Sequence, residues 1–293
     1  MSQSAPARYC GRLFTAKEIE LITRLISGTT KPNRAQLSRL VCDELRWFRL
    51  DGRRKDMACR VAMLRMHRDG LISLPAPLKG NSNGRIRPKS TAACDPCALL
   101  EIPAGDFGEL RFLPVDTPHD SARWNELIER YHYLGYKPLP GAQLRYLVFG
   151  GEHLLAALGF GAAAWAVAPR DRFIGWTAGQ RRRNLHLVIN NARFLVLPWI
   201  KSPNLASRIL GAAARRIAGD WQDRYKYSPA LLETFVEKER FRGTCYRAAN
   251  WTLVGATLGR GKLDRYNKWS LPVKDIFLYP LVKDFRSKLC LKE

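Results

Sequence analysis

The sequence predicts an α+β protein of two domains, a helical N-terminal domain followed by a larger mixed α/β domain. Three observations predict it. Residues 15–68 carry apolar side chains at helical spacing in three blocks, residues 79–91 contain almost no apolar residues, and the chain beyond residue 120 switches between helical and strand-like patterns. The 293 residues are 46% hydrophobic, which is enough for two cores. We expect a helical domain at 1–78, a linker and extended arm at 79–119, the α/β domain at 120–269 and a C-terminal arm at 270–293.

The first two helices are predicted from their caps. Thr15 precedes an apolar-periodic segment and is followed three residues later by Glu18, which is the spacing of a capping box. Gly28 lies just beyond the last periodic residue and is typical of a helix end. Asn33 then precedes a second periodic segment as its N-cap.

A third helix is expected from about Lys55 to Arg68, after which Gly70 leads into a short strand over Leu71–Leu74. Three helices, a glycine turn and a strand are the pattern of a winged helix-turn-helix, whose third helix enters the major groove of DNA. The alternative is a small helical domain with solvated arginines. The cations expected to contact DNA here are Arg53, Arg54, Lys55 and Arg60.

The larger domain is expected to begin with an amphipathic helix capped by Ser121. A hairpin of strands 144–149 and 154–160 follows, joined by Gly150-Gly151. The later segments are predicted in the order basic loop 179–184, strand 185–198, helix 204–225, strand 228–236, short helix 243–251, strand 252–258 and a C-terminal arm from 270.

Charge is the strongest signal in the composition. Lys and Arg number 49 against 26 Asp and Glu, a formal net charge of +23. Such an excess indicates a polyanionic partner, and nucleic acid is the obvious one. A general bias toward arginine is the alternative. No apolar run is long enough to span a membrane, no basic amphipathic helix indicates a membrane surface, and the first residues lack the apolar core of a secretion signal. We expect a cytoplasmic protein without a membrane partner.

The order of elements in the larger domain resembles that of the GNAT acyl-CoA-dependent N-acetyltransferases. Ala192–Pro198 stands where that family has its central strand, and Asn204–Tyr225 stands where it has the following helix. The resemblance implies a glycine-rich loop between them that binds the pyrophosphate of CoA. This chain has WIKSPNLAS at that point, without a glycine, so we expect a GNAT-like core that lacks the CoA loop, and CoA is not an expected cofactor.

Several strings also resemble the DruA family, which occurs in the Druantia anti-phage system of bacteria and in or beside transposases. They are YHYLGYKPLPGAQLRYLV, NNARFLVLPW, LLETFVEKERFRGTCYRAANW and VGATLGRGKLD, together with the segment from Arg39 to Pro75. The resemblance covers nearly the whole chain. It implies a DNA-directed role in defence or in mobile elements.

Tyr246 is the first catalytic candidate. A phenol can attack a DNA phosphate if nearby cations stabilise the developing charge and lower its pKa. The cations close to it in sequence are Arg242, Arg247 and Arg260, which are also expected to bind DNA. The structural alternative is a buried tyrosine that is hydrogen-bonded to a neighbouring strand. In a GNAT-like fold a tyrosine at this place can instead serve as a general acid.

Glu233 and His132 are the other catalytic candidates. Strand alternation places Glu233 on an apolar face, where a raised pKa suits proton transfer or binding of a divalent metal such as Mg²⁺. A buried salt bridge, for example to Arg193, is the alternative. His132 lies where the first helix of this domain breaks, and its alternative is a purely structural role. Cys245 has no nearby histidine to activate it. The single CxxC motif of Cys94 and Cys97 supplies only two ligands, so no metal site is expected there and no residue is named as a metal ligand.

Two glycine- and cation-rich segments are the best candidates for phosphate contacts, because glycine lets a backbone approach a strand closely. They span residues 179–184 and 259–268, and the residues expected to bind DNA are Arg181, Arg182, Arg183, Arg260, Lys262 and Arg265. Tyr266 and Trp269 could stack on exposed bases. The alternative is a solvated charged face.

The sequence therefore predicts a DNA-binding protein that acts on foreign or mobile DNA, with three mechanisms open. The chain could cut or join strands through Tyr246. It could be a non-catalytic module that recruits a helicase or other defence or transposition proteins. A GNAT-type acyltransferase is the third alternative.

Overall fold

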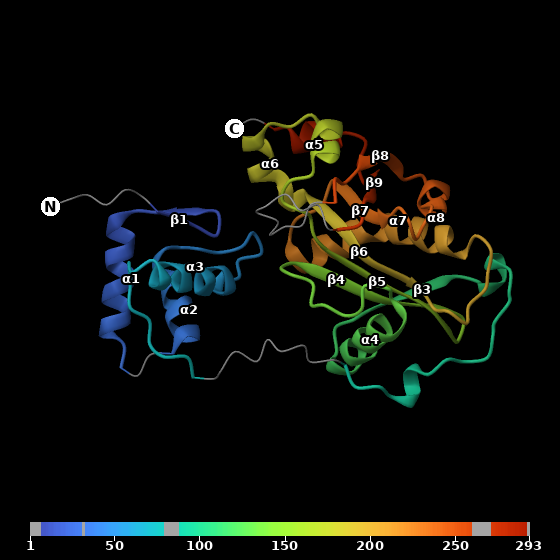
Figure 1. Ribbon diagram of the computed structural model, residues 1–293, viewed down its shortest axis with the longest axis horizontal. Helices are drawn as coiled ribbons and strands as arrows, with labels where there is room; N and C mark the ends of the chain where they lie inside the picture. Colours follow the sequence, from blue (N-terminus) through green and yellow to red (C-terminus); the bar gives the residue numbers. More distant parts are fainter. Residues whose placement is uncertain (1–6, 31–32, 79–87, 260–270, 292–293) are drawn as a thin grey trace. The chain divides into compact units, whose positions relative to one another are not determined.

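The structure is a computed structural model of the chain that describes residues 7–30, 33–78, 88–259 and 271–291. It divides into two compact units, residues 1–86 and residues 87–293 (Figure 1). Each unit has its own hydrophobic core and is described by itself.

The described residues of the N-terminal unit form three helices and one small hairpin. Its elements are β1 (Ala7–Tyr9), β2 (Arg12–Phe14), α1 (Ala16–Gly28), α2 (Arg34–Glu44) and α3 (Asp56–Arg68). The expected caps are confirmed: Thr15 and Glu18 form a capping box at the start of α1, and the side chain of Asn33 accepts backbone N–H bonds at the start of α2. Phe14, Ile22 and Met66 are fully buried in the core between these elements.

The strand expected over Leu71–Leu74 does not form, so the wing of a winged helix is absent at this place. Ile72 instead packs into the core, and its carbonyl oxygen lies 3.1 Å from Nδ1 of His67. The backbone of this segment is thus held by a side chain of α3 rather than by a partner strand. The small sheet of the unit precedes the helices, where β1 and β2 pair antiparallel.

The larger unit is a seven-stranded sheet with helices on both faces. Its strands are β3 (Leu110–Pro114), β4 (Gln143–Gly150), β5 (His153–Ala162), β6 (Val188–Val196), β7 (Leu231–Glu237), β8 (Thr252–Ala256) and β9 (Lys274–Pro280). Its helices are α4 (Pro118–Tyr131), α5 (Ala168–Ile174), α6 (Ala178–Asn184), α7 (Leu205–Tyr225), α8 (Thr244–Ala248) and α9 (Phe285–Leu289), with short 3₁₀ turns at Ala92–Cys94, Ala104–Phe107 and Leu185–Leu187.

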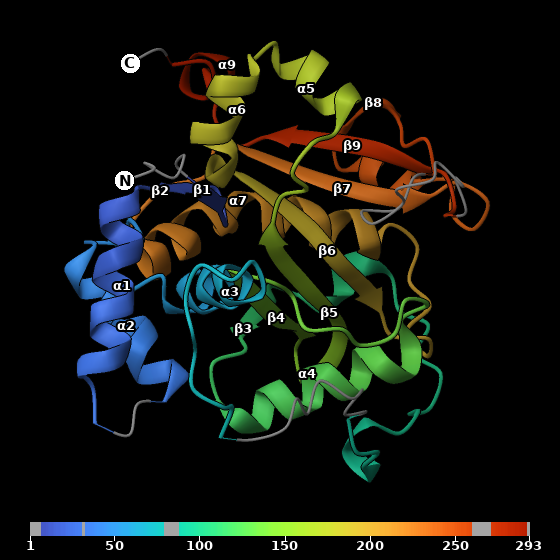
Figure 2. The same cartoon turned by 60° about the vertical axis from the view of Figure 1, so that its left-hand side comes forward.

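The strand order is β3-β4-β5-β6-β7-β9-β8, and among these described strands only β6 and β7 pair in parallel. Their pairing is short, because it joins residues 188–190 to residues 231–233 while both strands continue beyond it. The two strands separate after Asn190 and Glu233, and this separation is visible in Figure 2. A gap between strands in the middle of a sheet is a natural place for a ligand site.

The C-terminal segment is a strand of the sheet and not the extended arm that the sequence predicted. β9 lies between β7 and β8, paired antiparallel with both. Asp275, Ile276, Phe277 and Leu278 are buried there. Pairing on both edges satisfies the backbone hydrogen bonds of β9, so that the end of the chain holds the sheet together.

Helices α4 and α5 cover one face of the sheet, and α7 and α8 cover the other (Figures 1 and 2). Consecutive residues of β7 show the two sides: the side chain of Glu233 reaches Arg170 of α5, and that of Thr234 reaches Tyr246 of α8. Trp124 of α4 packs close to Gly159 on β5, where an added Cβ would lie 2.9 Å from the ring.

Two local expectations for this unit were wrong. Thr117, and not Ser121, caps α4, because its side chain accepts from the N–H of Asp120 and Pro118 occupies the first turn. Residues 178–184 form helix α6 rather than a loop, because Thr177 and Gln180 make a capping box. None of the helices in the described part of the chain is long and apolar enough to cross a membrane.

Candidate functional site

The separation of β6 from β7 opens a cleft of about 490 Å³. A bulge contributes to it: Arg193 pairs with Gly159 and Asn191 with Phe160, which leaves Ala192 without a partner in the register. Further walls come from the chain that follows α4 and from α8. The residues used below that line this cleft are Tyr131, His132, Tyr133, Asn191, Phe194, Thr234, Arg240, Phe241, Arg242 and Tyr246.

Tyr246 forms the polar floor of the cleft with Asn191 and Thr234. Its hydroxyl donates to Oδ1 of Asn191 at 2.8 Å, and only 7% of the residue is exposed. Burial raises the pKa of the phenol. The ring stacks on Phe277 at 5.7 Å and meets Phe194 edge-on. This environment keeps the phenol protonated, which suits a hydrogen-bond or proton donor.

His132 is the C-cap residue of α4 and also lines the cleft. Burial and the charges of Arg193 and Lys274 lower its pKa to about 4, so the ring is neutral at pH 7. Its Nδ1 accepts the N–H of Leu134 at 3.2 Å. A neutral ring that accepts at Nδ1 carries its proton on Nε2, which makes His132 a hydrogen-bond donor there.

Aromatic and basic side chains lie together on the chain that borders the cleft. The guanidinium of Arg240 lies 5.1 Å from the ring centre of Tyr133, and Tyr133 meets Phe241 edge-on at 5.2 Å. Phe241 is 45% exposed, and Arg242 is also exposed. Exposed rings beside cations are suited to stacking on bases and binding phosphates.

The charges of Arg193 and Lys274 act on His132, although neither residue is among those that line the cleft. Arg193 is 9% exposed; its Nη1 donates to the carbonyl of Ala192 at 2.7 Å, while its enclosed Nε has no partner in the described structure. Burial lowers the pKa of Arg193 and of the half-buried Lys274. The sequence analysis considered Arg193 only as a partner for Glu233, and the charged side chain within a strand-like segment was the available signal.

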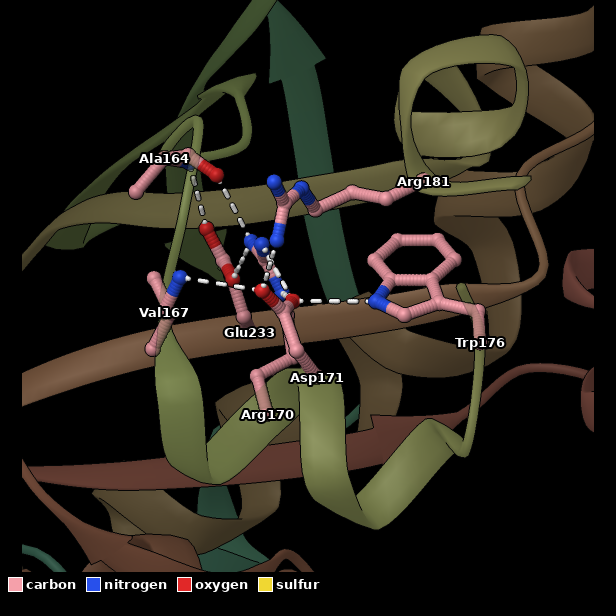
Figure 3. A network of polar contacts seen from close by, with 7 residues as sticks. All are labelled: Ala164, Val167, Arg170, Asp171, Trp176, Arg181 and Glu233. Atoms are coloured by element: carbon pink, nitrogen blue, oxygen red, sulfur yellow. Dashed lines mark hydrogen bonds and ion pairs between the residues drawn. The ribbon is translucent and has the colours of Figure 1, made fainter. Parts of the chain in front are cut away.

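Glu233 is not in the cleft, because it points to the opposite face of the sheet. Its Oε2 accepts from Nη1 of Arg170 at 2.8 Å and its Oε1 from the N–H of Ala164 at 2.8 Å (Figure 3). Burial raises the pKa of this carboxyl, while Arg170 and the Ala164 N–H lower it. The buried salt bridge that was the alternative for Glu233 is therefore present, with Arg170 rather than Arg193 as the partner.

The Glu233 contact belongs to a larger network under α5 (Figure 3). Asp171 accepts from Arg170 at 2.8 Å, from Nε1 of Trp176 at 3.0 Å and from Arg181 at 2.7 Å. Arg181, which was expected to contact DNA, therefore forms an ion pair with the carboxylate of Asp171. Its neighbours on α6, Arg182 and Arg183, are exposed.

A second site lies in the N-terminal unit, where the connection between α2 and α3 forms an open pocket of about 610 Å³. Arginines dominate its lining, and Phe48, which is 38% exposed, lies among them. The lining residues are Arg39, Phe48, Arg49, Gly52, Arg53, Arg54 and Asp56. The sequence analysis named Arg53 and Arg54 but missed Arg39 and Arg49, because only the fold brings them to one place.

The structure separates the expected DNA-binding residues of this unit into two groups. Arg54 pairs with Asp43 at 2.6 Å, and Arg60 pairs with Asp56 at 2.8 Å. Arg53 and Lys55 are exposed, and the structure records no ion pair for either among the residues that it describes.

In the larger unit, Arg247 donates to the carbonyl of Arg242 at 3.1 Å. Arg260, Lys262, Arg265, Tyr266 and Trp269 lie outside the described residues.

The structure thus brings His132 and Tyr246 together and separates both from Glu233. No group of three or more His, Cys, Asp or Glu side chains that could hold a metal ion occurs in the described segments. Cys245 borders the cleft, and burial raises the pKa of its thiol.

Comparison with protein families matches residues 65–269 to the family described as Druantia protein DruA. This range includes both faces of the cleft and the α6 segment. No curated protein matches the chain.

Among solved structures, those similar to this chain include an aminoglycoside acetyltransferase AAC(6')-Ib in complex with coenzyme A, at 14% identity and a TM-score of 0.39 over 58% of this chain and 93% of that one. A spermidine N-acetyltransferase chimera from Vibrio cholerae and hSSAT has 10% identity and a TM-score of 0.38, over 59% and 95%. FeeM, an N-acyl amino acid synthase from uncultured soil microbes, has 15% identity and a TM-score of 0.36, over 59% and 91%. With scores below 0.5, these likenesses carry no argument about the reaction.

Proposed function

Because this chain belongs to the DruA family, we propose that it acts in anti-phage defence and that it does so by binding DNA. The observation that carries the proposal is the arginine-lined pocket between α2 and α3. In this proposal α3 is the helix presented to DNA, in the manner of a helix-turn-helix, and the pocket beside its N-terminus receives the phosphate backbone.

The charge balance of the pocket supports a phosphate ligand. Its lining contains four arginines and one carboxylate, and that carboxylate, Asp56, already pairs with Arg60. Arg54 is neutralised by Asp43. Arg39, Arg49 and Arg53 have no ion pair among the described residues, so a strand that enters would exchange its counterions for these charges. Phe48 offers an exposed ring for a base.

The test is fluorescence anisotropy with labelled single-stranded and duplex DNA across a salt series. Replacing Arg39, Arg49 and Arg53 by alanine should weaken binding at least tenfold at about 0.1 M salt and should lower the slope of log K against log salt by about two to three. A matched triple variant replaces the exposed Lys17, Arg24 and Arg68, which removes the same charge from outside the pocket. Equal losses in the two triple variants would show that only total charge matters and would reject the pocket.

A second candidate function is cutting or joining DNA strands at the cleft of the larger unit, as a nuclease or recombinase would. It is favoured by one observation, that Tyr246 and His132 line the same cleft. The raised pKa of Tyr246 fits a proton donor better than an attacking phenolate. The test incubates DNA with wild type and Tyr246→Phe, with and without Mg²⁺, on denaturing gels before and after protease.

Each outcome of that experiment assigns a mechanism. A covalent protein–DNA band that depends on Tyr246 would establish strand transfer through the phenol. Cleavage without such a band would indicate hydrolysis. DNA binding without cleavage would leave a module that recruits a helicase or another defence protein.

A further inference from the structure

We infer that the cleft between β6 and β7 binds one unpaired nucleobase, with the phosphates next to that base held by Arg240 and Arg242. The inference rests on the DNA binding proposed above and deepens it, because it names the part of a strand that the larger unit takes. The observation that carries it is the make-up of the cleft lining, which combines neutral polar groups, aromatic rings and exposed cations.

The charged residues that line the cleft are cations. Arg240 and Arg242 are among the lining residues, whereas no Asp or Glu is found there within the described chain. Arg242 is exposed and has no ion pair among the described residues; the side chain of Arg240 is 54% exposed, and its Nε lies 3.5 Å from Glu237. The lining therefore attracts the negative charge of a phosphate and contains no carboxylate that would repel it.

The buried part of the lining is polar without being charged. The hydroxyl of Tyr246 donates to Oδ1 of Asn191 at 2.8 Å, and that of Thr234 donates to the carbonyl of Asn191 at 3.0 Å. None of these three residues is more than 7% exposed. Nε2 of His132 carries a proton, and the described structure records no acceptor for it. A neutral group with acceptor atoms suits this lining, because a buried charge would lose its hydration without a counter-charge.

Two aromatic rings line the cleft beside the arginines. Phe241 is 45% exposed and meets Tyr133 edge-on at 5.2 Å, and the guanidinium of Arg240 lies 5.1 Å from the ring centre of Tyr133. An exposed ring of this kind is a surface on which a base can stack. Phe241 lies between Arg240 and Arg242 in the chain, so a base on its ring has its phosphates close to both cations.

An unpaired base suits the cleft better than a base pair does. The volume of about 490 Å³ is that of a site for a small molecule. A base in a duplex enters such a site only after it has lost its partner and its stacking, whereas a single strand offers its bases without that cost. A free nucleotide has the same chemistry, and the experiment below separates the two sources.

The test uses the full chain and three ligands. Fluorescence anisotropy compares a labelled single strand with an abasic strand of the same length, which has the same phosphates and no bases. Calorimetry measures binding of a deoxynucleoside monophosphate. The ratio of the affinities for the intact and abasic strands reports the contribution of the bases alone.

Phe241→Ala should lower this ratio by about fivefold or more, because stacking contributes to the affinity of each base. It should leave the affinity for the abasic strand and the Tm unchanged, because much of the ring is exposed in the free protein. The matched control is Trp165→Ala, which removes a ring that is 57% exposed and does not line the cleft, and this variant should keep the wild-type ratio. An unchanged ratio in Phe241→Ala, or equal losses for both strands, would overturn the inference.

The phosphate contact is tested by Arg242→Ala. It should weaken the intact and abasic strands alike and lower the slope of log K against log salt by about one. The matched control is Arg172→Ala, because Arg172 is also exposed and does not line the cleft. Equal effects of the two variants would remove the phosphates from Arg242 and overturn that part of the inference.

The nucleotide identifies the source of the base. Binding of the nucleotide that is lost in Phe241→Ala would assign the cleft to free nucleotides as well as strands. A Phe241-dependent strand ratio without nucleotide binding would assign it to a base within a strand.

The proposed arginine pocket is tested apart from the cleft. The Arg39, Arg49 and Arg53 triple variant should weaken the intact and abasic strands, and Phe241→Ala in that background should still lower their ratio. Full affinity of the triple variant would reject the arginine pocket and leave the cleft inference standing. If the wild type bound neither strand nor nucleotide, both proposals would be wrong.

Discussion

Nη1 of Arg170 donates to Oε2 of Glu233 at 2.8 Å, and neither side chain has any exposed surface. The pair joins α5 to β7, and the N–H and carbonyl groups of Ala164 complete it by bonding to Glu233 and Arg170 respectively. Each group therefore has a partner in a place where an isolated charge would be very costly.

Removing one member of this pair should destabilise the protein strongly. Arg170→Met leaves the Glu233 carboxylate buried without its cation, and we expect a loss of about 3–5 kcal/mol in the free energy of unfolding. Urea denaturation measures it. The double variant Arg170→Met with Glu233→Leu should lose less than the sum of the two single variants. Additive losses would show that the two charges do not interact.

The same pair should not matter for ligands of the cleft. Glu233 points to the α5 face, and Thr234, the next residue, points to Tyr246. A folded Glu233→Gln protein should therefore bind DNA as the wild type does. A selective loss of binding at full stability would return Glu233 to the functional site.

His132 should make the stability of the protein depend on pH. Its folded-state pKa of about 4 lies below the ordinary value of 6.5, so between these values the unfolded chain takes up a proton that the folded chain does not. Stability should thus fall as the pH drops from 6.5 toward 4. At pH 5 the contribution is about 2 kcal/mol, since one pKa unit corresponds to about 1.4 kcal/mol.

The measurement compares urea unfolding at pH 7 and pH 5 for wild type and His132→Gln. The variant should lose about 2 kcal/mol less than the wild type over this interval. His119→Gln is the control, because its side chain is 84% exposed at the start of α4. If His132→Gln keeps the full pH dependence of the wild type, the ring is not held neutral by its surroundings.

Gly243 should be essential for the position of Tyr246. It has a φ of +66° at the start of α8, and an added Cβ would lie 2.6 Å from the ring of Phe277. Gly243→Ala therefore adds a steric collision to the cost of a left-handed backbone, and we expect a loss of about 2–4 kcal/mol. Tyr246 stacks on the same Phe277 ring, so the cleft should be altered as well.

Gly175→Ala is the matched control for this prediction. Its φ is +86°, but nothing lies within 4 Å of an added Cβ. It should lose only about 1 kcal/mol from backbone strain. Thermal unfolding of both variants measures the difference, and equal losses would show that the contact with Phe277 has no effect.

Much of the local structure follows from the sequence alone. Thr15 with Glu18, and Asn33, determine where the first helices start, because a cap acts on N–H groups two or three residues away. The hairpin of β4 and β5 follows from two largely apolar segments on either side of a glycine pair. The formal net charge of +23 is also known from the sequence alone, because it is a count of charged residues and does not depend on folding.

Only the tertiary structure decided which distant side chains meet. Local pattern does not choose between Arg193 and Arg170 as the partner of Glu233, because the choice depends on which face of the sheet each helix covers. The local sequence pattern also does not reveal that β9 lies between β7 and β8, because the pairing of strands far apart in the chain is fixed by hydrogen bonds along both edges. The separation of β6 from β7 likewise opens the cleft that His132 and Tyr246 both line, although they are far apart in the sequence.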